Sequence, residues 1–131
     1  MQPIASGQGQ AGAVVPGRAC RRGALHGSEA LHMMGEAAFA CAARHAGCAV
    51  TMARADAIAF VRPLPAGARP AIRAHIVFQG RSSMTVIVEI APGPDAAPAI
   101  TGRFMMVAVD GDGRPVAISV PDQSAKEELR P

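Results

Sequence analysis

The sequence LHGS at residues 25–28 is a stretch of the chain whose residues could take part in chemistry. It leads into a segment that we predict to be helical, and the first turn of a helix carries backbone N–H groups without partners inside the helix. Such groups can bind an anion, or an oxyanion that forms during a reaction, and alone this is a weak indication of function. His26 could orient a substrate or accept a proton there, although a histidine that only packs in the loop is the simpler interpretation.

Carboxylates and cysteines offer other routes to catalysis. Glu29 and Glu36 lie two turns apart on one side of the predicted helix, and a carboxylate beside a carbonyl group can act as a general base. A solvated or ion-paired role is the simpler interpretation of both. Cys20 would need a neighbouring base and a lowered pKa to act as a nucleophile, and no Cys–His–Asn arrangement stands out. The histidines and cysteines lack metal-ligand spacing, so the sequence predicts no metal site and no cofactor.

Residues 27–45 are predicted to form one long helix. Alanine dominates the segment, proline is absent, and Gly35 is the only glycine inside it. Arg44 and His45 suit the negative end of the helix dipole, and Gly47 follows as a stop. His32 is interpreted as a helix-surface residue. The apolar side chains that recur every three or four residues, and that define the face expected to be buried, are Leu31, Met34, Ala38, Cys41 and Ala42.

Strand-like segments separated by turns make up the rest of the chain. A proline-rich connection at 61–70, a turn at 80–81 and the sequence DGDG at 110–113 divide them. The predicted strands cover residues 14–15, 49–60, 71–78, 83–90 and 100–110, with 116–120 as a candidate extension. The side chains expected to point inward are Val50, Met52, Ile58 and Phe60 in one strand, and Ile72, Ala74, Ile76 and Phe78 in the next.

The order of these elements predicts an α+β fold. Consecutive strands joined by tight turns need no crossover helices, so the sheet should be antiparallel with the helix on one face. This is the hotdog fold, an antiparallel β-sheet wrapped around one long central α-helix. We expect residues 1–13 to be a flexible N-terminal segment, 14–121 the single domain, and 122–131 a solvated C-terminal tail.

Composition excludes several classes of function. The net charge is only +3, the arginines are scattered, and there is no tyrosine or tryptophan on which bases could stack, so nucleic-acid binding is not expected. No apolar run approaches the roughly 18 residues of a membrane span, and no signal peptide is apparent. Three cysteines without a CxxC pair are typical of reduced thiols, which predicts a cytoplasmic protein.

Several motifs in this order resemble the acyl-CoA hydrolase branch of the hotdog thioesterase superfamily. The likeness covers roughly residues 15–120, and the motifs are specific in combination rather than singly. They are a GxxHG sequence at 23–27, ARHAGC at 43–48, VT at 50–51, FxxP at 60–63, GRSSM at 80–84 and FMMVAVDGDGRPV at 104–116.

The resemblance implies that two subunits join their sheets into a homodimer, and that dimers assemble into tetramers or hexamers. It implies an active site at the dimer interface, where backbone N–H groups at the start of the helix hold the thioester carbonyl. A carboxylate on the helix activates water or attacks the carbonyl, and an Asn from the preceding loop helps to position it. Coenzyme A is part of the substrate. Arg81, Ser82 and Ser83 could contact its phosphates or form only a hairpin turn, and Thr51 could contact the substrate or be a buried strand residue.

The chain departs from the family pattern at its most important positions. The oxyanion-binding end falls on His26, Gly27 and Ser28, where Ser28 replaces a second glycine but keeps its backbone donor. The loop Asn falls on Cys20, which cannot supply an amide's donor and acceptor groups. The catalytic acid falls on Gly35, which has no side chain. Glu36 is adjacent, but one residue along a helix turns a side chain by about 100°.

These residues leave two main hypotheses. The first is an acyl-CoA thioester hydrolase that produces a free acid and CoA, with Glu36 or His26 replacing the usual acid. The second is a catalytically impaired hotdog protein that binds CoA or acyl groups, or serves only in assembly. A dehydratase on the same fold is a weaker third hypothesis, because such an enzyme would need a histidine and an acidic residue at positions other than those found in this sequence.

Overall fold

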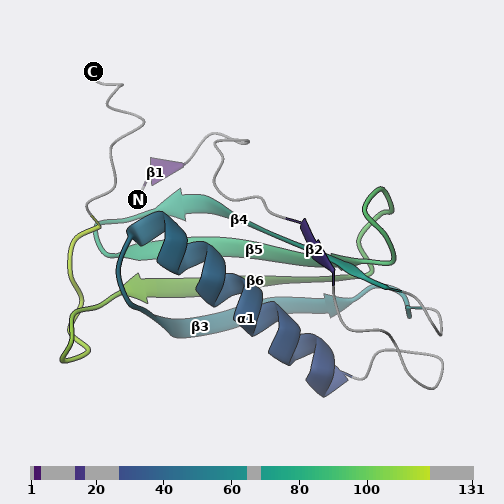
Figure 1. Cartoon of the computed structure of the whole chain (residues 1–131), viewed down its shortest axis with the longest axis horizontal. Coiled ribbons are helices and arrows are strands. Elements are labelled where there is room, and N and C mark those ends of the chain that lie inside the picture. Colours follow the sequence, from purple (N-terminus) through teal and green to yellow (C-terminus); the bar gives the residue numbers. More distant parts are fainter. Residues whose placement is uncertain (1, 4–13, 17–26, 65–68, 119–131) are drawn as a thin grey trace.

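A computed structural model describes residues 2–3, 14–16, 27–64 and 69–118 of the chain. The predicted site residues Cys20 and His26, and most of the predicted terminal segments, lie outside these ranges. The described elements, shown in Figure 1, are β1 (Gln2–Pro3), β2 (Val14–Pro16), α1 (Gly27–Ala46), β3 (Val50–Phe60), β4 (Ala71–Gln79), β5 (Ser83–Ala91) and β6 (Ile100–Ala108).

The four long strands form an antiparallel sheet that α1 crosses on one face (Figure 1). The strand order is β1-β4-β5-β6-β3, and the short β2 also pairs with β4. β3 therefore lies at one edge of the sheet, paired with β6 on one side only among the described residues. The predicted α+β hotdog architecture is confirmed. No helix in the described part of the chain is long and apolar enough to cross a bilayer.

The face of α1 that packs on the sheet differs at one position from the predicted one. Leu31 is 44% exposed, whereas its neighbour Ala30 is fully buried. The buried stripe advances mostly in steps of four residues, so Leu31 is rotated by about 100° from the stripe and faces outward. The buried residues of α1 are Ala30, Met33, Met34, Ala38, Cys41, Ala42 and Ala46.

Two phenylalanines expected to point inward are instead exposed. Phe78 is 42% exposed because the register of β4 against β5 shifts between Ile76 and Phe78, which moves the Phe78 side chain to the other face. Phe60 is 51% exposed at the end of edge strand β3, where its ring lies beside the start of α1. A second irregularity, with Ala57 at a φ of 54°, precedes it.

Residues 116–118 do not form a strand, in contrast to the predicted extension. Val116 donates a backbone hydrogen bond to Ala108 (2.9 Å) and Ile118 donates one to Arg81 (2.8 Å), and both side chains pack against the core. The turn predicted at 110–113 is confirmed. The Asp110 carboxylate accepts hydrogen bonds from the backbone N–H groups of Asp112 and Arg114, both 2.9 Å long.

Glycine at position 102 of β6 leaves room for side chains that pack between the sheet and α1. A Cβ atom there would lie 2.7 Å from Cδ1 of Ile58, 2.9 Å from Cε of Met34 and 3.1 Å from Cε1 of Phe104. We predict that Gly102→Ala lowers the free energy of unfolding by about 1–3 kcal/mol, because three packed side chains must shift together. Urea denaturation checks this. Gly93→Ala is the matched control, since nothing lies within 4 Å of its added Cβ. Equal stability of the two variants would contradict the packing described here.

Candidate active site

A groove runs along the exposed side of α1, and we call it the helix groove. Its volume is about 690 Å³. Leu31, Gly35 and Phe39 follow one another at intervals of four residues and form its apolar ridge. Both large side chains are more than 40% exposed, which is unusual for residues of this type in a well-packed helix. The groove is lined further by His32, Glu36, Ala40 and Ala43 of α1 and by Ala49 and Val50.

Gly35 and Glu36 both line the helix groove, but only Glu36 offers a carboxylate. A Cβ atom on Gly35 would touch Met52 Cε at 3.7 Å, an ordinary van der Waals contact, so a side chain fits at this position. The Glu36 side chain is 64% exposed, and its Oε2 lies 3.3 Å from Nε2 of His32 one turn earlier. Glu36 is the only acidic side chain among the described residues of the groove. The structure therefore brings Gly35 and Glu36 together, with His32 as the neighbour of the acid.

The start of α1 is open to solvent. Gly27 and Ser28 are exposed, and Glu29 in the same turn is partly buried. The backbone N–H groups of this first turn have no partners within the helix, and such groups can bind an anion or oxyanion. The end of β3 lies beside this turn, since the Phe60 ring is 3.8 Å from the position of a Cβ on Gly27.

The predicted phosphate-binding residues lie at the other end of α1. The turn that holds Arg81, Ser82 and Ser83 follows Gln79, whose Oε1 hydrogen bonds to Nε2 of His45 in the last turn of the helix (2.7 Å). A helix of 20 residues is about 30 Å long. Within one subunit the structure therefore does not bring the 81–83 turn to the start of α1.

Thr51 lies near the 81–83 turn rather than in the helix groove. Thr51 pairs with Val107, and Val107 pairs with Ser83, so the three residues form one row across β3, β6 and β5. Met52 points toward Gly35 of the helix. Because neighbouring side chains of a strand alternate, Thr51 points to the opposite face of the sheet.

Cysteine and metal chemistry find little support in the described part of the chain. Burial in the core raises the pKa of the Cys41 thiol to about 11, which keeps it protonated at neutral pH and unreactive as a nucleophile. The described residues contain no group of three side chains that could hold a metal ion.

Sequence reasoning missed the ridge of the helix groove. The apolar pattern of the sequence predicts Leu31 in the core, and it indicates no role in a site for Phe39 or His32. The signal was present, because Leu31, Gly35 and Phe39 repeat at four-residue intervals beside the buried stripe. Two apolar stripes on one helix indicate two partners, of which the sheet is one.

Comparison with known proteins places this geometry in a family. A model described as the thioesterase superfamily matches residues 22–99 of the chain. The chain belongs to the thioesterase superfamily. The resemblance inferred from its motifs is thereby confirmed, and so is its interpretation as a thioesterase.

Individual thioesterases show how far the likeness extends. A Zymomonas mobilis protein named as an uncharacterised acyl-CoA thioester hydrolase is 35% identical over 100 residues, which cover 73% of this chain and 67% of the relative. An acyl-CoA hydrolase of Staphylococcus aureus, solved with butyryl coenzyme A and coenzyme A, has a TM-score of 0.77 at 24% identity; the match covers 90% of this chain and 77% of that one. A hexameric thioesterase of Yersinia pestis has a TM-score of 0.69 at 22% identity, covering 84% and 93%. The two solved structures share the fold.

Proposed function

We propose that this thioesterase hydrolyses acyl-CoA to a free acid and CoA, in the helix groove. The observation that carries the proposal is that Glu36 lines a groove on the same helix whose first turn is open to solvent. A developing oxyanion needs hydrogen-bond donors, and an attacking water needs a base. The start of α1 and its exposed side supply both kinds of group. The naming of the Zymomonas mobilis relative supports acyl-CoA as the substrate class.

The unpaired edge of β3 suggests how a complete site forms. Two copies of β3 that pair antiparallel about a two-fold axis form one continuous sheet, with the start of each strand beside the end of the other. The start of α1 lies beside the end of β3, near Phe60. Pairing therefore brings Gly27 and Ser28 of one subunit toward the start of β3 of the partner subunit. The row from Thr51 to Ser83 spans two strand spacings, about 10 Å, on the face of the sheet opposite the helix, and it leads to the 81–83 turn.

We assign roles within this shared site. Backbone N–H groups of Gly27 and Ser28 hold the thioester carbonyl oxygen. Glu36 lies about 12 Å from Ser28 along α1. It therefore removes a proton through bridging water molecules from the water whose oxygen attacks the carbonyl carbon. The tetrahedral intermediate then collapses, the carbon–sulfur bond breaks, and the CoA sulfur leaves with the proton that Glu36 accepted. Arg81, with Ser82 and Ser83, contacts the nucleotide phosphates from the partner subunit. His26 is the alternative base, and Cys20 occupies the position of the usual loop Asn.

The assembly follows from the same geometry. The homodimer uses the β3 edge and the helix groove. Of the five large apolar side chains that are exposed in the described part of the chain, four lie on or beside α1 and the end of β3. We extend the proposal to a hexamer of three such dimers, as the Yersinia pestis thioesterase is hexameric.

A second candidate function is binding of acyl-CoA without hydrolysis. Gly35 favours it, because this position has no side chain to act as a base. The contact of Glu36 with His32, and the 64% exposure of the Glu36 side chain, also place that carboxylate at the margin of the groove. The two candidate functions differ in one measurable quantity, which is turnover.

Glu36→Gln tests the assignment of the base. We predict that this variant lowers kcat for acyl-CoA hydrolysis by about 100-fold or more, because it keeps the size of the side chain but removes its basicity. Loss of thioester absorbance, followed with short, medium, long and aromatic acyl-CoAs, is the measurement. Asp112→Asn, a similar change in an exposed turn, serves as the control and should leave kcat unchanged. Full activity of Glu36→Gln would exclude Glu36 as the base.

Gly35→Asp tests whether the missing carboxylate limits the enzyme. The space beside Gly35 accepts a side chain, so we predict at least a tenfold gain in kcat with little loss of stability. Gly35→Asn is the matched control, since it fills the same space without a base and should give no gain. If Gly35→Asp binds CoA as the unmodified protein does but gains no activity, then the carboxylate at 35 is not what this site lacks.

A further inference from the structure

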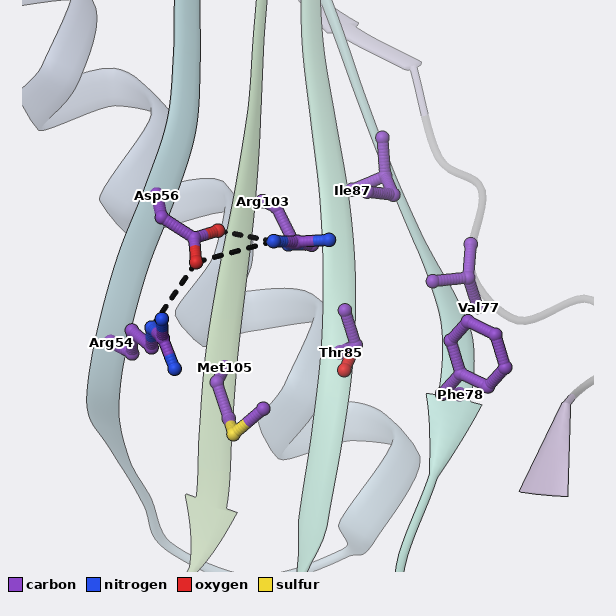
Figure 2. Close-up of a pocket in the computed structure, with 8 residues that line it drawn as sticks. All are labelled: Arg54, Asp56, Val77, Phe78, Thr85, Ile87, Arg103 and Met105. Atoms are coloured by element: carbon purple, nitrogen blue, oxygen red, sulfur yellow. Dashed lines mark hydrogen bonds and ion pairs between the residues drawn. The ribbon is translucent and has the colours of Figure 1, made fainter. Parts of the chain in front are cut away.

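A second hollow lies on the face of the sheet opposite α1, and we call it the outer hollow (Figure 2). Its volume is about 370 Å³, within the range of small-molecule pockets. Arg103 pairs with Asp56 on one side and with Ile87 on the other, and these three residues form one row across the strands. Met105 and Thr85 form part of the next row on the same face. The residues that alternate with them, such as Phe104, point to the core beneath α1.

An ionic cluster with an excess of one positive charge borders the outer hollow. Arg103 donates two hydrogen bonds to Asp56, from Nε to Oδ1 (2.8 Å) and from Nη2 to Oδ2 (3.3 Å). Nε of Arg54 lies 3.1 Å from Oδ2 of the same carboxylate. Both oxygens of Asp56 are thus engaged, and the hydrogen bond from Arg103 holds the pKa of Asp56 below its usual value. Nη1 of Arg103 takes no part in these bonds and remains free to bind an anion.

The floor of the outer hollow holds a buried hydroxyl group. Thr85 is 6% exposed and is the one buried polar residue in the described part of the chain. None of the side-chain hydrogen bonds among the described residues involves its hydroxyl group. A buried hydroxyl without a partner is costly, and it is satisfied when a ligand or water reaches it. Figure 2 shows the Arg103 side chain extending from β6 across β5, with Ile87 on one side and Thr85 on the other.

The remaining walls are apolar. Val77 and Ile87 are half-buried and line the hollow together with Met105. Phe78, 42% exposed, stands at the margin because the register shift in β4 brings it to the face of its pairing partner Thr85. The outer hollow therefore combines one free cationic donor, one buried hydroxyl and an apolar wall on the far side of both.

We infer that the outer hollow binds a small monocarboxylate with a compact apolar body. The carboxylate accepts a hydrogen bond from Nη1 of Arg103, while the apolar body lies against Ile87 and Phe78. The Thr85 hydroxyl points away from Arg103 in Figure 2, and rotation about the Cα–Cβ bond of Thr85 lets it donate a hydrogen bond to the same carboxylate. Asp56 and Arg54 keep the Arg103 guanidinium in position. This site lies on the opposite side of the sheet from the helix groove, so the inference goes beyond the proposed hydrolase function and does not depend on it.

Hexanoate is a suitable probe, with hexan-1-ol as the matched ligand that lacks the charge. In protein carrying ¹³C-labelled methionine methyl groups, hexanoate should shift the Met105 signal saturably, and hexan-1-ol at the same concentration should not. Arg103→Met should weaken hexanoate binding at least tenfold, because it removes a charge-assisted hydrogen bond. Thr85→Val, which keeps the shape of the side chain, should weaken it several-fold. Arg114→Met, in an exposed turn, is the control variant and should bind normally.

Four results would overturn the inference. The first is a Met105 signal that does not move saturably with hexanoate in the folded, unmodified protein. The second is an equal shift of the Met105 signal with hexan-1-ol, which would mean that the hollow is an apolar surface without a carboxylate site. The third is a Met105 signal that changes with protein concentration alone and loses its response to hexanoate, which would mean that a second copy of the chain covers this face. Binding of hexanoate that Arg103→Met and Thr85→Val leave intact would also contradict the assigned contacts.

Discussion

The packing of α1 on the sheet is the contact on which the rest of the structure depends. Alanines such as Ala38 and Ala42 on the buried side of the helix, and Gly102 on β6, allow helix and strands to approach closely. That stripe uses only one side of α1. Leu31 and Phe39 consequently face outward and form the apolar ridge of the helix groove. The position of the candidate site is therefore a consequence of how the core is packed.

The same packing divides the predicted site between the two ends of one subunit. The first turn of α1 and Glu36 lie on the helix, whereas Arg81 and Thr51 lie beyond its other end. A helix about 30 Å long separates these groups, and side chains cannot bridge that distance. Antiparallel pairing of two β3 edges would place them side by side. In the described part of the chain, the free edge of β3 and the exposed ridge of α1 would both be covered by the second subunit that we propose.

The sequence predicted the helix, the four long strands and their antiparallel order, because the hydrophobic periods of both element types are regular and the turns are marked by glycine and proline. It did not predict the exposure of Phe78 and Phe60. The register shift in β4 reverses the face of Phe78, and the alternation of residue types carries no sign of it. Leu31 was misplaced because two apolar stripes lie side by side on α1. Among the predicted site residues, the neighbours Gly35 and Glu36 both line the helix groove. Arg81 and Gly27 lie at opposite ends of α1, so they would share a site only if a partner subunit supplied one of them.

Subunit complementation tests the shared site most directly. Glu36→Gln removes the base of one subunit, and Arg81→Ala removes the phosphate contact supplied by the other. When the two inactive variants are unfolded, mixed in equal amounts and refolded together, half of the dimers should be mixed, and one of the two sites in each mixed dimer should carry neither change. A site shared between two subunits predicts that this mixture recovers about a quarter of the kcat/KM of the unmodified protein. No recovery from mixed dimers, with each variant alone also inactive, would mean that Glu36 and Arg81 serve a site within one subunit and would contradict the account.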